Sequence, residues 1–406
     1  MKTVLLRLSG FTLLPLLSLV IPLMLLPVIS SFVGGTGIAS VMSGQAIGTF
    51  AATVIMWGWN IDGPIAIARA ATTHDRSAIY LSSIRTRLVL LIIVLPVTAV
   101  LTAIVVLPEF RVEAISMALA SAFVGMSPAW YCIGLGRPRL LALFDTVPRF
   151  LATLVSIPIL MLTHQLWAYT VILGGATAFA LVLFHRGYSR GGKWYPTHLT
   201  AMVRELKSQA HTASINVAGN SYGSTPVPIA TATTSPAMSG ALATADTLYR
   251  YGLFSVVALG NALQAWVLDQ NTPGERRRQI LAIVLHAILG VVGAIILTVL
   301  GPTVSSLIFA GQARADTLVC FYYGIAFAFI SASTPLIRNL IIPAGKSQLV
   351  LLCTVASAGV GVAGMIIAGL FGQASGIALS MAGSELILFS TLLIPGLRIL
   401  NGKQEA

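Results

Sequence analysis

The sequence predicts an all-α, polytopic membrane protein with twelve transmembrane helices in two six-helix lobes. Of its 406 residues, 56% are hydrophobic and 9% are charged, whereas roughly 25% are charged in an ordinary soluble domain. Apolar stretches of about 20 residues, long enough to cross a bilayer core, recur along the whole chain. Basic residues gather in the short segments between these stretches, as the positive-inside rule expects of cytoplasmic loops.

The apolar stretches divide into two sets of six. In the N-terminal half they are Phe11–Phe32, Ile38–Trp59, Leu88–Leu107, Val112–Ile133, Leu140–Leu162 and Gln165–Phe184. In the C-terminal half they are Ala210–Ala237, Leu248–Leu268, Gln279–Leu300, Leu318–Ile342, Leu349–Phe371 and Ala374–Leu397. We therefore expect an N-terminal lobe at residues 1–184, a cytoplasmic linker at 185–209 and a C-terminal lobe at 210–406. An even number of helices per half makes the lobes parallel repeats.

The positions of the positive charges indicate which loops face the cytoplasm. With both termini in the cytoplasm, 19 of the 24 Lys and Arg residues fall in inner segments. The other five are Arg111, Arg149, Arg250, Arg314 and Arg338. Arg87, for example, ends the inner segment before the third span. The net charge of +12 therefore reflects membrane topology and not a nucleic-acid surface.

The linker predicts a short amphipathic helix, because Trp194, Tyr195, Leu199 and Met202 stand among basic residues. Such a helix would lie on the anionic inner leaflet. A solvated linker fits the same residues equally well.

Several classes of activity find no support in the sequence. The extramembrane segments are too short for a soluble catalytic domain, and no Gly-rich phosphate loop followed by Lys-Ser or Lys-Thr is present. Cys132, Cys320 and Cys353 are isolated and have neither metal nor redox spacing. We expect no cofactor, no metal, no nucleic acid and no enzymatic activity.

Arg149 is a charge placed deep in an apolar span. Counting from Leu140, a rise of about 1.5 Å per residue puts Arg149 roughly 13 Å into a core of about 30 Å. A charge there costs at least a few kcal/mol and must face protein, water or substrate. Asp145 lies four residues earlier on the same helical face. Either the two side chains simply pair, or Arg149 binds a phosphate or carboxylate and Asp145 tunes it.

The seventh span is rich in Ser, Thr, Asn and Gly. It either packs through small residues or lines a wet cavity. Asn216 and Asn220, four residues apart, share a helical face and are candidate substrate contacts.

Two further charged positions are candidates. Asp246 and Arg250 are expected near the outer end of the eighth span. Their i, i+4 spacing fits an ion pair at the rim, and it also fits a substrate contact by Arg250. Glu385 lies about halfway along the last span without a basic neighbour in its own helix. A carboxyl there is either a proton-coupling group or a protonated group that hydrogen-bonds across helices.

Three stretches resemble the polysaccharide repeat-unit (Wzx-type) flippases of the multidrug/oligosaccharidyl-lipid/polysaccharide exporter superfamily. They are WGWNIDGPIAIARA at 57–70, SPAWYCIGLGRPRLLALFDTVPRFL at 127–151 and ATADTLYRYGLFSVVALGNALQAWV at 243–267. The resemblance implies a multi-pass transporter of the bacterial plasma membrane that flips a polyprenyl-diphosphate-linked oligosaccharide by alternating access. It also implies proton or cation coupling, and a polymerase and glycosyltransferases as partners.

The implied roles fall on the residues already singled out. Arg149 would hold the diphosphate or an acidic sugar, Asn216 and Asn220 would contact sugar, and Glu385 would carry the proton. Two alternatives stay open: a multidrug or small-molecule antiporter of the same superfamily, and a membrane-embedded glycosyl- or acyltransferase.

Overall fold

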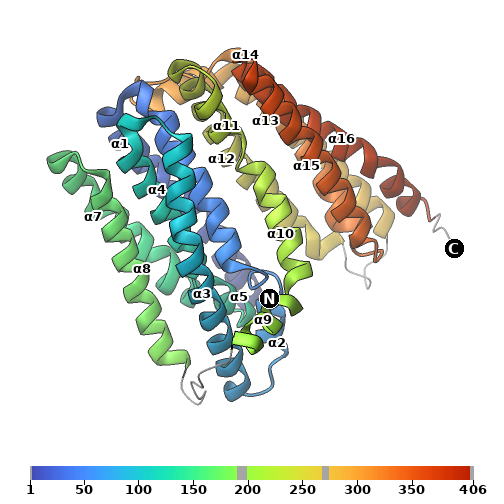
Figure 1. The fold of residues 1–406 in the computed structure, drawn as a ribbon. Helices are drawn as coiled ribbons and strands as arrows, with labels where there is room; N and C mark the ends of the chain where they lie inside the picture. The colour runs from blue at the N-terminus through green and yellow to red at the C-terminus, as the bar shows by residue number, and fades with distance from the viewer. Residues whose placement is uncertain (1, 190–198, 268–273, 403–406) are drawn as a thin grey trace. The chain divides into compact units, whose positions relative to one another are not determined.

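The computed structural model describes residues 2–189, 199–267 and 274–402, which fold as helices joined by short turns (Figure 1). These residues contain no strand, so the predicted all-α class is confirmed. Nine of the described helices are long and apolar enough to cross a membrane, as expected of a polytopic membrane protein. The chain forms two compact units, Met1–Ser224 (unit 1) and Thr225–Ala406 (unit 2).

Unit 1 contains the helices before the middle of the expected seventh span. They are α1 (Lys2–Met56), α2 (Asp62–Arg69), α3 (Thr73–Val105), α4 (Arg111–Phe123), α5 (Ala129–Gly134), α6 (Pro138–Leu141), α7 (Val147–Thr163), α8 (Leu166–Tyr188), α9 (Leu199–Ser208) and α10 (Ala210–Gly223). Gly34, with φ 63° and ψ −179°, divides α1 into the first two expected spans. Glycine takes this conformation without the steric penalty of a Cβ atom.

Close packing of α1 on α4 organises the middle of unit 1. A Cβ atom on Gly44 would lie 2.1 Å from the carbonyl oxygen of Ala114, and one on Gly48 equally close to that of Ala118. This spacing of small residues lets two helix backbones touch, as in other membrane helix pairs. Helix α1 also packs on α7, which in turn packs on α8.

The third span begins earlier than hydropathy predicts. Helix α3 starts at Thr73 because Thr72 and Asp75 form a capping box, in which the Thr72 hydroxyl accepts from the Asp75 amide at 3.1 Å. Arg87 therefore lies inside the helix, fully buried, and not in a loop. Its placement on the cytoplasmic side stays a prediction.

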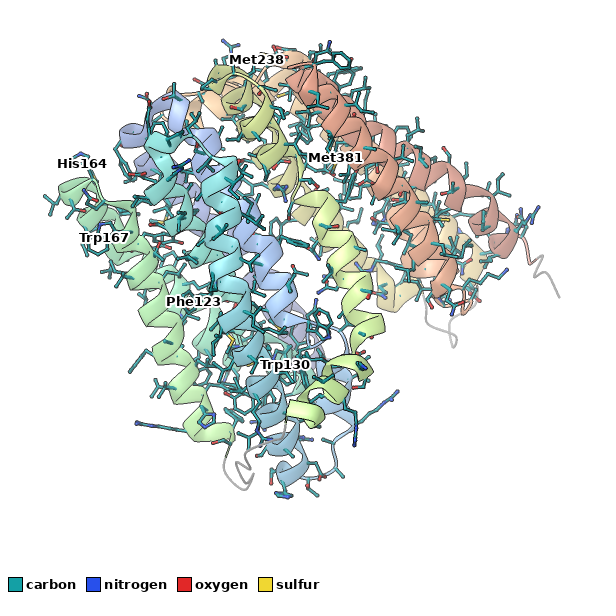
Figure 2. All side chains as sticks on the ribbon, in the orientation of Figure 1. Phe123, Trp130, His164, Trp167, Met238 and Met381 are labelled. Atoms are coloured by element: carbon teal, nitrogen blue, oxygen red, sulfur yellow. The ribbon has the colours of Figure 1, made fainter. Side chains whose placement is uncertain are left out.

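Arg87 sits beside an aromatic cluster. Trp130, labelled in Figure 2, packs 5.2 Å from Trp59 between ring centroids, and the Arg87 guanidinium carbon lies 5.8 Å from the Trp130 ring. Tyr80 and Tyr131 are buried in the same cluster. The aromatic faces partly compensate the buried charge.

Irregular turns interrupt two spans of unit 1. A 3₁₀ turn, η2 (Val124–Met126), separates α4 from α5, and a π-helical turn, η3 (Ala142–Thr146), precedes α7. Such π turns occur frequently at functional sites. They bring Ser127 and Asp145 into hydrogen-bonding contact.

The expected linker helix is present as α9, whereas Trp194 and Tyr195 lie outside the described residues. Helices α9 and α10 belong to unit 1 and pack on its helices α3 and α1, and Trp57 Nε1 donates to the Leu206 carbonyl at 3.0 Å. The division between the two units therefore falls at Ser224, later than residues 185–209. A functional division at the linker stays a prediction.

Unit 2 contains α11 (Pro226–Thr233), α12 (Pro236–Val267), α13 (Glu275–Ile308), α14 (Thr317–Pro335), the π turn η4 (Leu336–Ile341), α15 (Ser347–Leu370) and α16 (Ala374–Leu400). The expected seventh span is broken into α10 and α11, because Pro226 and Pro228 lack the amide hydrogens that a continuous helix needs. The eighth span begins at Pro236 and not at Leu248. Proline is pre-organised for the first turn of a helix.

Candidate functional site

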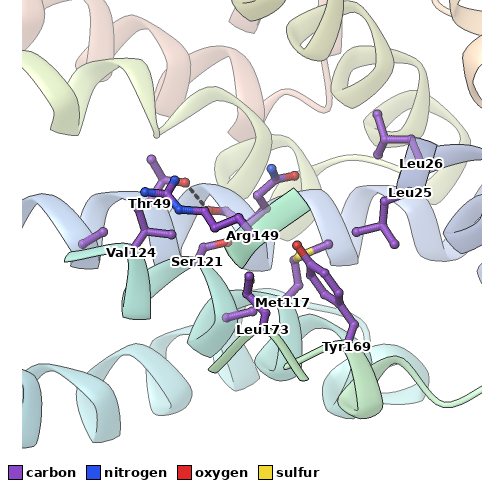
Figure 3. Close-up of a pocket in the computed structure, with 12 residues that line it drawn as sticks. Leu25, Leu26, Thr49, Met117, Ser121, Val124, Arg149, Tyr169 and Leu173 are labelled. Atoms are coloured by element: carbon purple, nitrogen blue, oxygen red, sulfur yellow. Dashed lines mark hydrogen bonds between the residues drawn. The ribbon is translucent and has the colours of Figure 1, made fainter. Parts of the chain in front are cut away.

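A pocket inside unit 1 is the candidate site, and Figure 3 shows its lining. Helices α1, α4, α7 and α8 contribute side chains, and its volume is about 210 Å³. The lining residues are Leu25, Leu26, Gln45, Thr49, Ala52, Met117, Ala120, Ser121, Val124, Arg149, Tyr169 and Leu173. Among these described residues Arg149 alone carries a charge.

The α1 side of the pocket follows from the glycine contact with α4. Because Gly44 and Gly48 face α4, the residues next to them, Gln45 and Thr49, are placed at the pocket. The Thr49 hydroxyl donates to the Gln45 carbonyl at 2.8 Å, which leaves its lone pairs available as acceptors. Ser121 of α4 and Tyr169 of α8 add two hydroxyl groups.

Arg149 enters the pocket from the first turn of α7. Its Nη2 donates to Asp145 Oδ1, and this ion pair spans η3 and α7 with i, i+4 spacing. The exposed fractions of the two side chains are 24% for Arg149 and 12% for Asp145. The predicted pairing is therefore present, and Arg149 also lines a cavity, as the ligand-binding interpretation requires.

Asp145 has a second partner that the sequence did not indicate. Ser127 donates its hydroxyl hydrogen to Asp145 Oδ1, the same oxygen that Arg149 contacts. The Ser127 hydroxyl oxygen also accepts from the Ala129 amide at 3.1 Å. Arg87 Nη1 in turn donates to the carbonyls of Gly125 at 3.2 Å and Ser127 at 2.9 Å, which fixes the turn that carries this hydroxyl.

The pocket combines one guanidinium with amide and hydroxyl groups inside an otherwise apolar wall. A guanidinium has a planar set of donors that matches phosphate and carboxylate oxygens, and low local polarity strengthens such hydrogen bonds. The volume is below the roughly 300–1,000 Å³ of typical small-molecule pockets. It accommodates a phosphate group or a single sugar ring, and an oligosaccharide requires a more open state.

The two candidate asparagines lie elsewhere in unit 1. Asn216 Nδ2 donates to Asn60 Oδ1 at 3.2 Å, and Asn220 Nδ2 donates to Asn216 Oδ1 at 3.1 Å. Both belong to α10, and neither is among the residues that line the Arg149 pocket. Their predicted contact with sugar therefore stays a prediction.

The Asp246–Arg250 pair is located in unit 2, well inside α12. The exposed fraction of Asp246 is 3%, so a pair at the rim of the eighth span is wrong. The reason is that α12 begins at Pro236, which places Asp246 several turns from the helix end. The role of Arg250 in substrate binding stays a prediction.

Glu385 lies on α16 and is 4% exposed. The Ser384 hydroxyl beside it donates to the Ser357 carbonyl of α15 at 2.8 Å. Glu385 is thus buried among packed helices. A proton-coupling carboxyl and a structural carboxyl would both be buried, so burial does not distinguish the two roles.

Sequence reasoning missed four polar residues of the pocket: Gln45, Thr49, Ser121 and Tyr169. A signal was present for the first two, because polar residues four apart in an apolar span share one helical face. Ser121 and Tyr169 belong to two other spans, and only tertiary packing brings them to Arg149.

No family model matches this chain, and no curated protein matches it. Solved structures do resemble it. The lipid II flippase MurJ in an inward closed conformation is 11% identical with a TM-score of 0.72, covering 98% of this chain and 90% of that chain.

Two structures of MATE, in complex with MaD3S and with MaL6, are also similar. The first has a TM-score of 0.52 at 14% identity, covering 97% of this chain and 94% of that chain. The second has a TM-score of 0.50 at 12% identity, covering 98% and 94%. At these identities the similarity concerns the fold: the chain has the fold of a lipid flippase and of MATE transporters, and is a multi-pass membrane protein.

Proposed function

We propose that this protein is a flippase that moves a polyprenyl-diphosphate-linked oligosaccharide from the inner to the outer leaflet of a bacterial plasma membrane. It serves surface polysaccharide biosynthesis, with glycosyltransferases that build the substrate and a polymerase that consumes it. Transport occurs by alternating access, with the headgroup carried inside the protein and the lipid tail in the bilayer. The Wzx-type motifs in the sequence and the fold of a lipid II flippase both support this proposal.

The observation that carries the proposal is the guanidinium of Arg149 at the wall of a polar-lined pocket within apolar helices. A cationic drug would be repelled by the Arg149 guanidinium, and a site for it would need acidic residues in the wall. A diphosphate or an acidic sugar instead gains charge-assisted hydrogen bonds from the guanidinium. Gln45, Thr49, Ser121 and Tyr169 supply the donors and acceptors that hydroxyl-rich ligands need.

Reconstitution tests this function directly. Purified protein in liposomes that contain a fluorescent lipid-linked sugar diphosphate should accelerate its appearance in the outer leaflet. Arg149→Ala should abolish this acceleration, and Arg149→Lys should reduce it, because lysine retains the charge and loses the planar geometry. Arg314→Ala, which changes an exposed arginine, is the matched control. Wild-type rates in both Arg149 variants would show that the binding assignment is wrong.

A multidrug or small-molecule antiporter is the second candidate function, and the fold similarity to MATE favours it. The buried carboxyl groups of unit 2, Asp246 and Glu385, are the residues that a cationic substrate or a proton would use. A deletion strain separates the candidates. Sensitivity to cationic drugs supports the antiporter, and loss of surface polysaccharide with unchanged drug sensitivity supports the flippase.

A further inference from the structure

Asp145 accepts two hydrogen bonds at a single oxygen. Both the Ser127 hydroxyl and Arg149 Nη2 donate to Oδ1. Arg149 also lines the pocket with 24% of its side chain exposed, whereas Asp145 is 12% exposed. Arg149 therefore faces two possible partners, the internal carboxylate and an anionic group that enters the pocket.

An entering anion must compete with Asp145 for the guanidinium. If Arg149 turned to the ligand and Asp145 had no other partner, a largely buried carboxylate would be left unpaired, which strongly opposes the exchange. Ser127 prevents this, because its hydroxyl remains bonded to Oδ1 whichever way Arg149 points. A hydrogen bond from a hydroxyl to a charged acceptor is stronger than a hydrogen bond between two neutral groups.

The position of Ser127 is fixed independently of Arg149. Arg87, which is fully buried, donates to the carbonyl of Ser127 itself and to that of Gly125. The Ala129 amide donates to the Ser127 hydroxyl oxygen, which orients the hydroxyl hydrogen toward Asp145. The hydroxyl is thus held by groups that do not touch the pocket.

We infer that Asp145 is a displaceable internal competitor for the anion site at Arg149, and that Ser127 is the positioning residue that makes the displacement possible. The site thereby selects ligands whose anionic charge exceeds that of a single carboxylate, such as a diphosphate. This inference rests on the proposed function, because it concerns the same guanidinium. It differs from a merely structural ion pair in the sign of its mutational effects.

The test measures binding of farnesyl diphosphate to the purified full-length protein in nanodiscs of zwitterionic lipid, with farnesol as the uncharged control. Asp145→Asn removes the competing charge and should tighten binding roughly tenfold. Ser127→Ala leaves Asp145 dependent on Arg149 and should weaken binding roughly five- to tenfold. In the Asp145→Asn background, Ser127→Ala should have little further effect, because the competitor it acts through is gone.

Control variants separate this effect from misfolding. Ser156→Ala, in α7 with Arg149, removes a buried hydroxyl that donates within its own helix to the Ala152 carbonyl at 2.6 Å, and should leave binding unchanged. Ser127→Thr retains the hydroxyl and should restore affinity toward wild type. If Ser127→Ala does not fold, Ser127→Cys, with a weaker donor of similar size, must weaken binding in its place.

The outcomes distinguish failure of the competitor role of Asp145 from failure of the proposed anion site at Arg149. Equal binding by wild type and Arg149→Ala would overturn the proposed anion site itself. Loss of binding in Arg149→Ala, combined with weakened binding in Asp145→Asn, would overturn the competitor role and leave the anion site standing. Additive effects of the Ser127 and Asp145 substitutions would show that Ser127 acts through the fold and not through Asp145.

Discussion

Gly48 of α1 and Ala118 of α4 lie so close that a Cβ atom on the glycine would be 2.1 Å from the alanine carbonyl oxygen. Real Cβ atoms do not approach a backbone oxygen to this distance, so the two helices can pack here only with glycine. The adjoining Thr49 is placed at the Arg149 pocket by the same contact. One close contact between α1 and α4 thus also places one wall of the candidate site.

Gly48→Ala should therefore destabilise the protein by about 2–3 kcal/mol, because the clash is with backbone and cannot be relieved by a side-chain rotation. Thermal unfolding of the purified protein in detergent measures the effect. Gly175→Ala in α8 is the matched control, since a Cβ atom there meets nothing within 4 Å. An unchanged midpoint for Gly48→Ala would contradict the close helix contact.

Arg87→Met tests the buried cation. The substitution removes the group that donates to the carbonyls of Gly125 and Ser127. It also removes a buried guanidinium whose Nε and Nη2 have no hydrogen-bond partner. The lost hydrogen bonds outweigh the relieved burial because the carbonyls remain in place, so we expect a net loss of about 1–3 kcal/mol. Exposed Arg69→Met should be neutral in the same unfolding experiment. A stabilised Arg87→Met variant would show that desolvation dominates.

The sequence allowed the helical class and most spans to be predicted, because hydropathy directly reports which segments are apolar. It placed helix ends poorly. Helix α3 begins at Thr73, in polar sequence, with a capping box, and α12 begins at Pro236, before a run of small and polar residues. A search for apolar stretches therefore placed both helix starts too late. For the same reason, the burial of Arg87 and Asp246 was not predicted.

The candidate site was only partly visible in the sequence. Arg149 and Asp145 could be paired because both lie on one helical face at i, i+4 spacing. Ser127 and Tyr169 come from other elements, and their approach depends on how the 3₁₀ and π turns redirect the chain. Local spacing contains no information about such lateral packing, and hence the second partner of Asp145 emerged only from the structure.

Asp246→Asn tests the buried pair in unit 2. Asp246 is 3% exposed and its carboxylate pairs with Arg250, whose side chain is 33% exposed. Removing the negative charge weakens the pair, and because Arg250 is partly solvated we expect a loss of roughly 1–3 kcal/mol, below the full cost of breaking a buried pair. Thermal unfolding measures it, with the exposed Glu109→Gln as control. A loss no larger than that of the control would indicate a weak surface pair.

Glu385→Gln separates the two roles that its position allows. Glutamine has the same shape and hydrogen-bonding reach as glutamic acid, so the buried site on α16 should still fold, but it cannot release a proton. If Glu385 is the coupling group, liposomes with the variant should flip lipid-linked sugar at equal pH on both sides and lose the acceleration that an imposed pH gradient gives the wild type. Glu109→Gln should keep that acceleration. If the Glu385 variant still responds to the gradient as the wild type does, its carboxyl is structural, and Asp246 becomes the next candidate for coupling because it lies buried in the same unit.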